Sequence, residues 1–438
     1  MKWGISLLAL LIAGLAPAAP AAANGALPDK LEGHGGPIMA VSVSADGSEA
    51  LSASFDYSLI HWTLGSGKII QRLQGHLAAA NDVAFVPGEA KAVSVGDDGL
   101  VIFWDLASGE ITAKVEASTQ KILDVSVSPD GRFAAAAVWD GTARLFDIAT
   151  GAEVARLSGH KGNVNAVAFS PDSTVLYTAA HDGTILSWSV YDGRQQQKLV
   201  RHGWGINVLA VTADQVLFGA IDGTMAAVQP DTLARIDLAR SERPILSLKV
   251  ALNGRLAGFG DGTGSVKIFD AQTLELLQEG PVTYGPVWDF DFVPGTAQLY
   301  HVGLDDFIAR WQIAPAKRAQ IQTQLPRRFQ VRDSDDPGEL EFQRKCSVCH
   351  TLTADDGNRA GPTLFQVFGR RAGTLPGYLY SEALLNSDII WTEETIAALF
   401  DDGPDVLLPG TKMPIQRLKS IERRDELIRY LKEATQAE

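Results

Sequence analysis

The sequence predicts an all-β domain built from seven similar units, followed by a small all-α domain at the C-terminal end. Two observations lead to this division. A pattern of about 42 residues recurs seven times between residues 27 and 312. The only two cysteines of the chain, Cys346 and Cys349, stand three residues apart, directly before His350. With 438 residues and 46% hydrophobic content, the chain is long enough for two or three domains with sizeable cores.

The N-terminal segment has the pattern of a secretory signal peptide. One basic residue, Lys2, is followed by an apolar run from Ile5 to Leu15 and then by small residues up to Ala23. We predict that residues 1–23 are removed. A retained membrane anchor is the alternative, but the run is shorter than the ~20 residues that span a bilayer. Since no later segment is long and apolar enough, we expect an exported protein without an integral membrane segment.

The net charge of the chain bears on its partners. At −14, the formal charge disfavours nucleic acid and anionic membranes, because both bind through basic patches. The sequence therefore favours a protein as the main partner.

Each copy of the repeat holds the same signals in the same order. A Gly-His pair is followed by a hydrophobic strand, a turn of the Ser-Pro-Asp-Gly type, a strand of small residues, an Asp-Gly turn and a strand that closes on an aromatic residue. The copy that begins at Gly159 is the clearest. The residues six positions before the closing residue are Asp56, Asp98, Asp140, Asp182, Asp222, Thr263 and Asp305. Alternating hydrophobicity between frequent turn signals predicts short antiparallel strands.

Repeats of this length with Gly-His and Trp-Asp marks, such as Trp104-Asp105, resemble the WD-repeat family. The resemblance implies a seven-bladed β-propeller of the WD-repeat type over residues 24–313. Copies five to seven are degenerate, since they lack the Gly-His pair. In this family the sequence repeat is offset from the blade, so residues 27–33 are expected to supply the outer strand of the last blade and to close the ring.

Two roles remain open for the predicted propeller. It could be a catalytic domain with a cofactor on its axis, or a rigid ring whose loops dock another protein. By the resemblance, His34, His76, His160 and His202 hold the structural position that bonds the Asp of the Asp-Gly turn. The sequence contains no His-x-x-x-His pattern and no second haem motif, which favours docking.

The Cys346-x-x-Cys349-His350 run is the attachment signature of c-type haem. On a helix, cysteines at i and i+3 share one face, so each thiol can add to one haem vinyl group while the histidine binds the iron. A redox dithiol usually stands beside a βαβ pattern, and a zinc site needs two more ligands, whereas no Cys or His follows His350. We predict one covalently bound haem c, which together with the leader indicates the periplasm.

Met413 is predicted to be the second axial ligand of the iron. It is the only methionine after the motif, and no histidine lies in that region. The alternative is a methionine that fills the core. Its neighbours Pro409, Gly410 and Pro414 predict a loop, which favours the ligand role, and a His–Met pair is typical of electron transfer.

From Gly338 to the C-terminus the chain resembles a class I cytochrome c of the mitochondrial and bacterial c2 type. The residues that carry the likeness include "CSVCHTL", "AGPTLFQVFGRRAG", "PGYLYSEALLNSDIIW" and "PGTKMP". The resemblance implies an all-α domain over residues 338–438, in agreement with helices that the sequence pattern itself predicts at 339–349, 393–400 and 422–434. It also implies that Pro362 accepts a hydrogen bond from His350 and that Thr411 is a haem-site residue that precedes Met413, as in the family. Positions that hold the haem propionates in the family are Arg370, Tyr380 and Trp391, although ordinary packing is the alternative for these three.

The two predicted domains are joined by a linker, residues 314–337, which permits the haem domain either to pack on the propeller or to swing. The leading hypothesis is a periplasmic mono-haem electron-transfer protein whose propeller docks a redox partner protein of unknown identity. The alternative is a periplasmic oxidoreductase with a second cofactor or substrate site in the propeller and the haem as internal relay. A third is a sensor or assembly factor. Whether the chain is an enzyme is left open, and an electron carrier is favoured.

Overall fold

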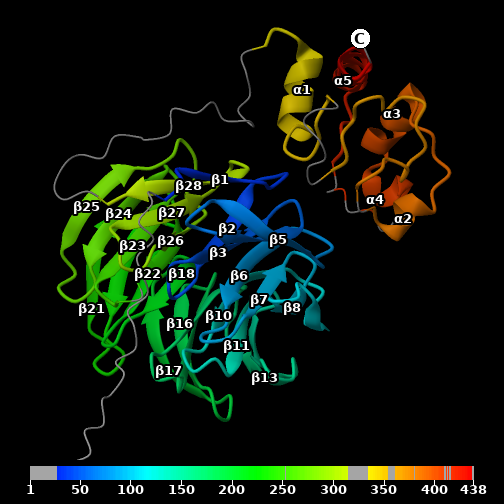
Figure 1. Cartoon of the computed structure of the whole chain (residues 1–438). Coiled ribbons are helices and arrows are strands. Elements are labelled where there is room, and N and C mark those ends of the chain that lie inside the picture. Colours follow the sequence, from blue (N-terminus) through cyan, green and yellow to red (C-terminus); the bar gives the residue numbers. More distant parts are fainter. Residues whose placement is uncertain are drawn as a thin grey trace, which may run out of the picture.

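The structure, a computed structural model, describes residues 27–251, 253–313, 334–353, 361–378, 380–408, 411, 413 and 416–436. The expected signal peptide, residues 1–23, and residues 314–333 of the expected linker lie outside these ranges. The larger part of the described chain is a β-propeller of seven four-stranded sheets, and the smaller part is helical (Figure 1). None of the described helices is long and apolar enough to cross a membrane.

Six blades are formed by four consecutive antiparallel strands each, and the seventh combines the two ends of the domain. The blades in order are β2 Ile38–Val43, β3 Glu49–Ser54, β4 Ser58–Thr63 and β5 Lys68–Gln74; β6 Ala80–Phe85, β7 Lys91–Gly96, β8 Leu100–Asp105 and β9 Ile111–Glu116; β10 Ile122–Val127, β11 Phe133–Val138, β12 Thr142–Asp147 and β13 Glu153–Ser158; β14 Val164–Phe169, β15 Val175–Ala180, β16 Thr184–Ser189 and β17 Gln195–Arg201; β18 Ile206–Val211, β19 Val216–Ala220, β20 Thr224–Val228 and β21 Arg235–Arg240; β22 Ile245–Val250, β23 Leu256–Asp261, β24 Ser265–Asp270 and β25 Leu276–Pro281; and β26 Asp289–Phe292, β27 Gln298–Val302, β28 Phe307–Gln312 and β1 Lys30–Glu32.

The position of a strand within its blade explains its composition. The second strand of each blade lies between two neighbouring blades, so both of its faces are buried. In β11 all six residues, Phe-Ala-Ala-Ala-Ala-Val, are buried, and small side chains allow the adjacent sheets to approach. The fourth strand lies at the rim and exposes most of its residues, as in β13. Hydrophobic clusters accordingly join successive blades: Phe133 of the third and Trp188 of the fourth belong to one cluster.

The N-terminal strand closes the ring. Leu31 pairs with Ile308 in the antiparallel ladder of β1 and β28. Next to this ladder the hydroxyl of Tyr300 donates to the Pro28 carbonyl at 2.8 Å, and Arg310 forms an ion pair with Asp29. Since β28 would otherwise have an unpaired edge, this pairing removes a site of edge-to-edge association and fixes the seventh blade to the start of the first.

Three blades contain a chain of buried hydrogen bonds that ties their strands together. In the second blade, His76 Nδ1 lies 3.0 Å from Asp98 and His76 Nε2 lies 2.8 Å from the Ser94 hydroxyl, which also accepts from Trp104 Nε1 at 2.9 Å. The first and fourth blades hold equivalent chains with Trp62 and Trp188. These bonds explain the Gly-His, Asp and Trp marks of the repeat, because each buried polar group needs a partner.

Polar side chains on the innermost strands bind the backbone of the next blade. Asn81 donates to the Ile122 carbonyl at 2.8 Å, and Asp124 accepts from Val167 N at 2.7 Å. Asn165, Asn207 and Ser247 form such bonds at the following boundaries, and Asp289 accepts from Val41 N. Polar residues of the inner strands, which their polarity alone would place in solvent, therefore bind one blade to the next.

The same strands bring buried carboxyl groups together near the propeller axis. Burial, and then the nearby charge of Asp124, raise the pKa of Asp82 to about 8. Burial also raises the pKa values of Asp289 and Asp291 to about 6. Burial alone would lower the pKa of Lys249, but these surrounding carboxylates raise it, and its Nζ lies 3.5 Å from Asp289. One lysine thus partly compensates several acidic groups.

The helical part comprises α1 Pro337–Lys345, α2 Glu382–Leu385, α3 Glu393–Asp401, α4 Pro404–Leu407 and α5 Ile421–Ala434. The first and last helices pack together, with the rings of Phe342 and Tyr430 5.9 Å apart. Their approach is close because residue 338 is glycine: a Cβ there would lie 2.2 Å from the Glu426 carbonyl oxygen. The expected helix 339–349 is too long, since α1 ends at Lys345.

Replacing Ser94 with alanine tests the buried hydrogen-bond chain. The indole N–H of Trp104 and Nε2 of His76 would both lose their partner in the core, which we expect to lower the free energy of unfolding by about 2–4 kcal/mol. Denaturant unfolding measures the change. Thr178→Ser in the fourth blade keeps its hydroxyl and is the matched control. Equal stability of Ser94→Ala and the wild type would contradict this role.

Replacing Asp82 with asparagine tests the buried carboxyl group. The native state keeps this proton to about pH 8, whereas the unfolded chain releases it near pH 4. The stabilisation from Asp82 is therefore complete below pH 4 and is lost as the pH rises toward 8, by up to about 1.4 kcal/mol per unit. Urea unfolding from pH 5 to 8 should show a shallower pH dependence for Asp82→Asn than for the wild type. Asp231→Asn, at an exposed position, is the control for the loss of one carboxyl group, and an equal change of slope in both variants would contradict the assignment to Asp82.

Candidate functional site

The two cysteines and the histidine stand in a tight turn directly after α1. Asp336 caps the start of this helix by accepting from Gly338 N at 2.7 Å and from Glu339 N at 3.2 Å. Cys346 is the C-cap, and the backbone N–H groups of Cys349 and His350 both donate to its carbonyl, at 2.9 and 2.8 Å. These bonds wind the motif into a turn, which is why the helix ends earlier than expected.

The imidazole of His350 is oriented by a backbone carbonyl. Its Nδ1 lies 2.7 Å from the Pro362 oxygen. Because a carbonyl only accepts, Nδ1 carries the hydrogen and the lone pair is on Nε2, the nitrogen suited to bind iron. Gly361 leaves room for the ring, since a Cβ at this position would lie 2.3 Å from His350 Cε1. The contact between His350 and Pro362 has the form that the resemblance implies.

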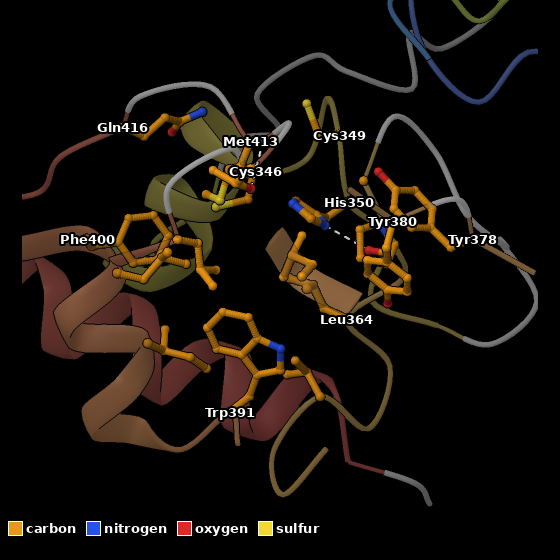
Figure 2. Close-up of a pocket in the computed structure, with 18 of the residues that line it drawn as sticks. Cys346, Cys349, His350, Leu364, Tyr378, Tyr380, Trp391, Phe400, Met413 and Gln416 are labelled. Carbon is orange, nitrogen blue, oxygen red and sulfur yellow. Dashed lines mark hydrogen bonds between the residues drawn. The ribbon is translucent and has the colours of Figure 1, made fainter. Parts of the chain in front are cut away.

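All nine residues expected at the haem site line one cavity: Cys346, Cys349, His350, Pro362, Arg370, Tyr380, Trp391, Thr411 and Met413. The cavity has about 1130 Å³ of empty space, part of it open solvent, and most of its other lining side chains are apolar. In Figure 2, His350 lies centrally, Cys346 and Met413 lie together on one side, and Trp391 lies on the other. A cavity of this kind matches a cofactor site.

Met413 is half-buried, and its side chain packs against the hydrophobic core of the helical part. Its backbone N–H donates to the Thr411 hydroxyl at 3.2 Å, which places Thr411 within the same loop. Pro409, Gly410 and Pro414, on which the expected loop rests, lie outside the described residues. The position of Met413 on the cavity wall is compatible with a ligand, and its role as ligand stays a prediction.

Arg370 holds the loop that carries Pro362. Its guanidinium donates to the carbonyls of Phe365 and Thr363 at 2.9 and 2.8 Å. Burial lowers its pKa, although the side chain still borders the cavity. Trp391 is held beside it, because its backbone N–H donates to the Arg370 carbonyl at 3.0 Å.

The donor groups and the lining of the cavity fit a haem. Burial, followed by the neighbouring Cys349, raises the pKa of the Cys346 thiol to about 12, so a reactive thiolate of the dithiol type is disfavoured there. Ser381 Oγ is buried on the cavity wall without a hydrogen-bond partner among the described residues. Two thiols, an oriented imidazole, a thioether and an apolar wall are the groups that a covalently bound haem requires.

The cavity is also lined by residues that the sequence did not single out, among them Gln416, Tyr378 and Tyr57. Gln416 fixes the methionine side of the cavity to α1, since its amide donates to the Lys345 carbonyl at 2.9 Å. Tyr378 stacks edge-on against Tyr380, with ring centroids 4.7 Å apart. Tyr57 belongs to the first propeller blade. Its only signal in the sequence is that tyrosine stands where other copies have the glycine of the Asp-Gly turn.

The propeller has a second cavity along its axis. Asp82, Asp124, Lys249 and Asp289 line it together with several inner-strand asparagines. Three of these acidic groups also accept hydrogen bonds from the next blade, so blade packing accounts for them. In the part of the chain that the structure describes, no group of three or more His, Cys, Asp or Glu residues is arranged to hold a metal ion.

Comparison with known proteins assigns the C-terminal part. Cytochrome c of Sesamum indicum is 47% identical over 100 residues, which cover 22% of this chain and 87% of the sesame protein. Cytochrome c of Ginkgo biloba is 41% identical over 101 residues, 23% of this chain and 88% of that protein. The protein of the same name from Gibberella zeae is 38% identical over 94 residues, with 22% and 88% coverage. These relatives imply a covalently bound haem.

The N-terminal part matches the family described as WD domain, G-beta repeat, in residues 25–63, 67–105, 109–147 and 151–189. These are the first four copies, which keep most of the Gly-His and Asp-Gly signals, while the structure adds three more blades of the same form. The chain therefore joins a seven-bladed WD-repeat propeller to a member of the cytochrome c family.

Proposed function

We propose that this protein is a periplasmic electron carrier with one covalently bound haem c, and that its propeller docks the redox partner. The helical part is then a class I cytochrome c domain. The observation that carries the proposal is that Cys346, Cys349, His350 and Met413 all line one largely apolar cavity. When bound, haem supplies one-electron oxidation and reduction at its iron.

The residues around the cavity have distinct tasks under this proposal. Cys346 and Cys349 attach the porphyrin, and the Pro362 carbonyl keeps the imidazole of His350 in one tautomer and orientation. Arg370, Tyr380 and Trp391 would hold the propionates. The Arg370 guanidinium donates to two backbone carbonyls and has five N–H groups in total, so donors remain for a carboxylate.

Export to the periplasm is part of the proposal. Covalent haem attachment and a leader of the secretory type both favour this compartment. The leader, residues 1–23, is supported by its sequence pattern alone.

One face of the propeller is suited to dock a protein. In every blade the turn between the second and third strands and the link to the next blade open on the same face, because the strands alternate in direction. Three large apolar side chains are more than half exposed on these links: Leu77, Trp204 and Tyr284. Aromatic and aliphatic residues exposed on one face favour association with a protein.

The alternative, an oxidoreductase with its own site in the propeller, would use the axial cavity. Its charged residues are the strongest candidates for such chemistry, with Lys249 among the carboxyl groups. Blade-to-blade hydrogen bonds already occupy Asp82, Asp124 and Asp289, so the carrier is favoured.

An optical spectrum with a haem assay tests the proposal directly. We expect one low-spin haem c per chain after expression in a host that matures c-type cytochromes. A second chromophore would favour the oxidoreductase, and a protein without covalent haem would rule out both functions.

Replacing Met413 with alanine tests the second axial ligand. Covalent haem content should stay at one per chain, because Cys346 and Cys349 are unchanged. The low-spin spectrum should be lost and the midpoint potential should fall by on the order of 100 mV, since the thioether no longer binds the iron. Met39→Ala, which removes a methionine from the propeller, is the control. A variant with the spectrum of the wild type would show that Met413 fills the core.

A further inference from the structure

One turn of the first blade differs from the equivalent turns of the next five blades. The residue just before the third strand has a positive φ in the first six blades. In blades two to six it is glycine, namely Gly99, Gly141, Gly183, Gly223 and Gly264, with φ between 71° and 95°. In the first blade it is Tyr57, with φ at 71°.

This conformation is unfavourable for a tyrosine. Residues with a Cβ are disfavoured in the left-handed region, and bulky side chains are rare there. At several of the equivalent turns in other blades, although not at Gly141, a Cβ would also meet the backbone of the link to the next blade. A Cβ at Gly99 would lie 1.9 Å from the Ser118 carbonyl oxygen, and one at Gly223 would lie 2.0 Å from that of Ser241. Contacts of the tyrosine side chain outside the turn must therefore compensate for the backbone strain.

The ring of Tyr57 reaches the haem cavity. Together with Cys349, His350 and Tyr378 it lines the same space, and among the described residues that line this cavity it is the one that belongs to the propeller. The pKa of Tyr57 is raised first by burial and then by Tyr378 and Cys349, as expected for a phenol enclosed beside them. The helical part accordingly lies beside the first blade in Figure 1.

The turn that carries Tyr57 is rigidly held. Its neighbour Asp56 accepts from Gly35 N at 2.6 Å and from Ser58 N at 2.9 Å, and His34 lies 3.0 Å from the same carboxyl group. The backbone N–H of Tyr57 donates to the Ser54 carbonyl at 3.1 Å. A side chain on so well-anchored a turn projects in a fixed direction.

We propose that Tyr57 is a positioning residue that packs the propeller against the haem domain, at the edge of the cavity where Cys349 attaches the haem. The two domains then form one unit instead of swinging on the linker. The inference rests on the proposed haem function. An aromatic ring with one polar end suits this place, because it covers apolar surface while its hydroxyl stays near polar groups. It also keeps water from that edge of the haem.

Restoring glycine to this turn, as Tyr57→Gly in the haem-loaded full chain, tests the inference. The change replaces a strained residue with the one that five other blades use, so the propeller should fold at least as well. Hydrogen–deuterium exchange in the loop that carries Tyr378 and Tyr380 should become about tenfold faster, because that loop loses its cover. Proteolysis between residues 314 and 337 should also become faster, and the midpoint potential should change as water reaches the haem edge.

Leu233→Gly is the matched control. Leu233 also has a positive φ, 59°, at a position where earlier copies have glycine such as Gly193, and it lies in the turn between β20 and β21. This variant relieves the same kind of backbone strain and should leave exchange, proteolysis and potential unchanged.

The outcomes separate the two proposals. If covalent haem is present in all variants and Tyr57→Gly exchanges and is cleaved like the wild type, the positioning role is wrong and the carrier function stands. If Leu233→Gly changes the haem loop as much as Tyr57→Gly does, the effect is one of general strain and the inference is again wrong. Absence of covalent haem in the wild type would instead overturn the proposed function.

Discussion

The antiparallel ladder between β1 and β28 is the contact on which the rest of the structure depends. Every other blade is formed by consecutive strands, so each could fold locally, whereas this ladder pairs the first described strand of the domain with the last. Two other sets of contacts join the first and last blades. Asp289 and Asp291 accept hydrogen bonds from the backbone N–H groups of the first blade, and one hydrophobic cluster spans both blades. Closure also fixes the start of the first blade, whose neighbouring turn carries Tyr57.

The shape of the haem cavity likewise depends on a few contacts between segments that are distant in the sequence. His350 is held between a carbonyl on one side and the glycine at 361 on the other, while Arg370 fixes the loop from which that carbonyl projects. The packing of α1 on α5 sets where the motif emerges from its helix. The position of the motif is thus set by backbone groups, by two glycines and by the side chain of Arg370. This is why a site spread over 68 positions, from Cys346 to Met413, can be well defined.

The haem-binding motif and the propeller repeats could be predicted from the sequence because each is a local pattern of residues. The motif of Cys346, Cys349 and His350 is contiguous, and the hydrogen-bond chains of the propeller place their residues at fixed offsets within one repeat. The match to the WD family covers the first four copies, and later copies depart further from the repeat pattern, as at Val228, where the closing aromatic residue is missing.

Features that depend on contacts between distant segments could not be predicted in this way. The end of α1 is set by bonds to the Cys346 carbonyl, which helical propensity does not reveal. The bonds between inner strands, such as that of Asp124 to Val167, join separate copies of the repeat. Tyr57 is a single replacement of the glycine that five other blades have at this turn. Its contact with the haem cavity is visible only in a structure, because the residues that line this cavity lie almost 300 positions further along the chain.

The replacement of one turn glycine by tyrosine has a consequence for symmetry. A closed ring of similar blades offers several nearly equivalent places at which a second domain could sit, and a linker alone would not choose among them. The side chain of Tyr57 is present on one blade only, so it distinguishes that blade from the others and fixes where the second domain packs on the ring. The haem would then face a single sector of the ring, and a partner seated on the links that carry Trp204 and Tyr284 would always meet it from the same direction.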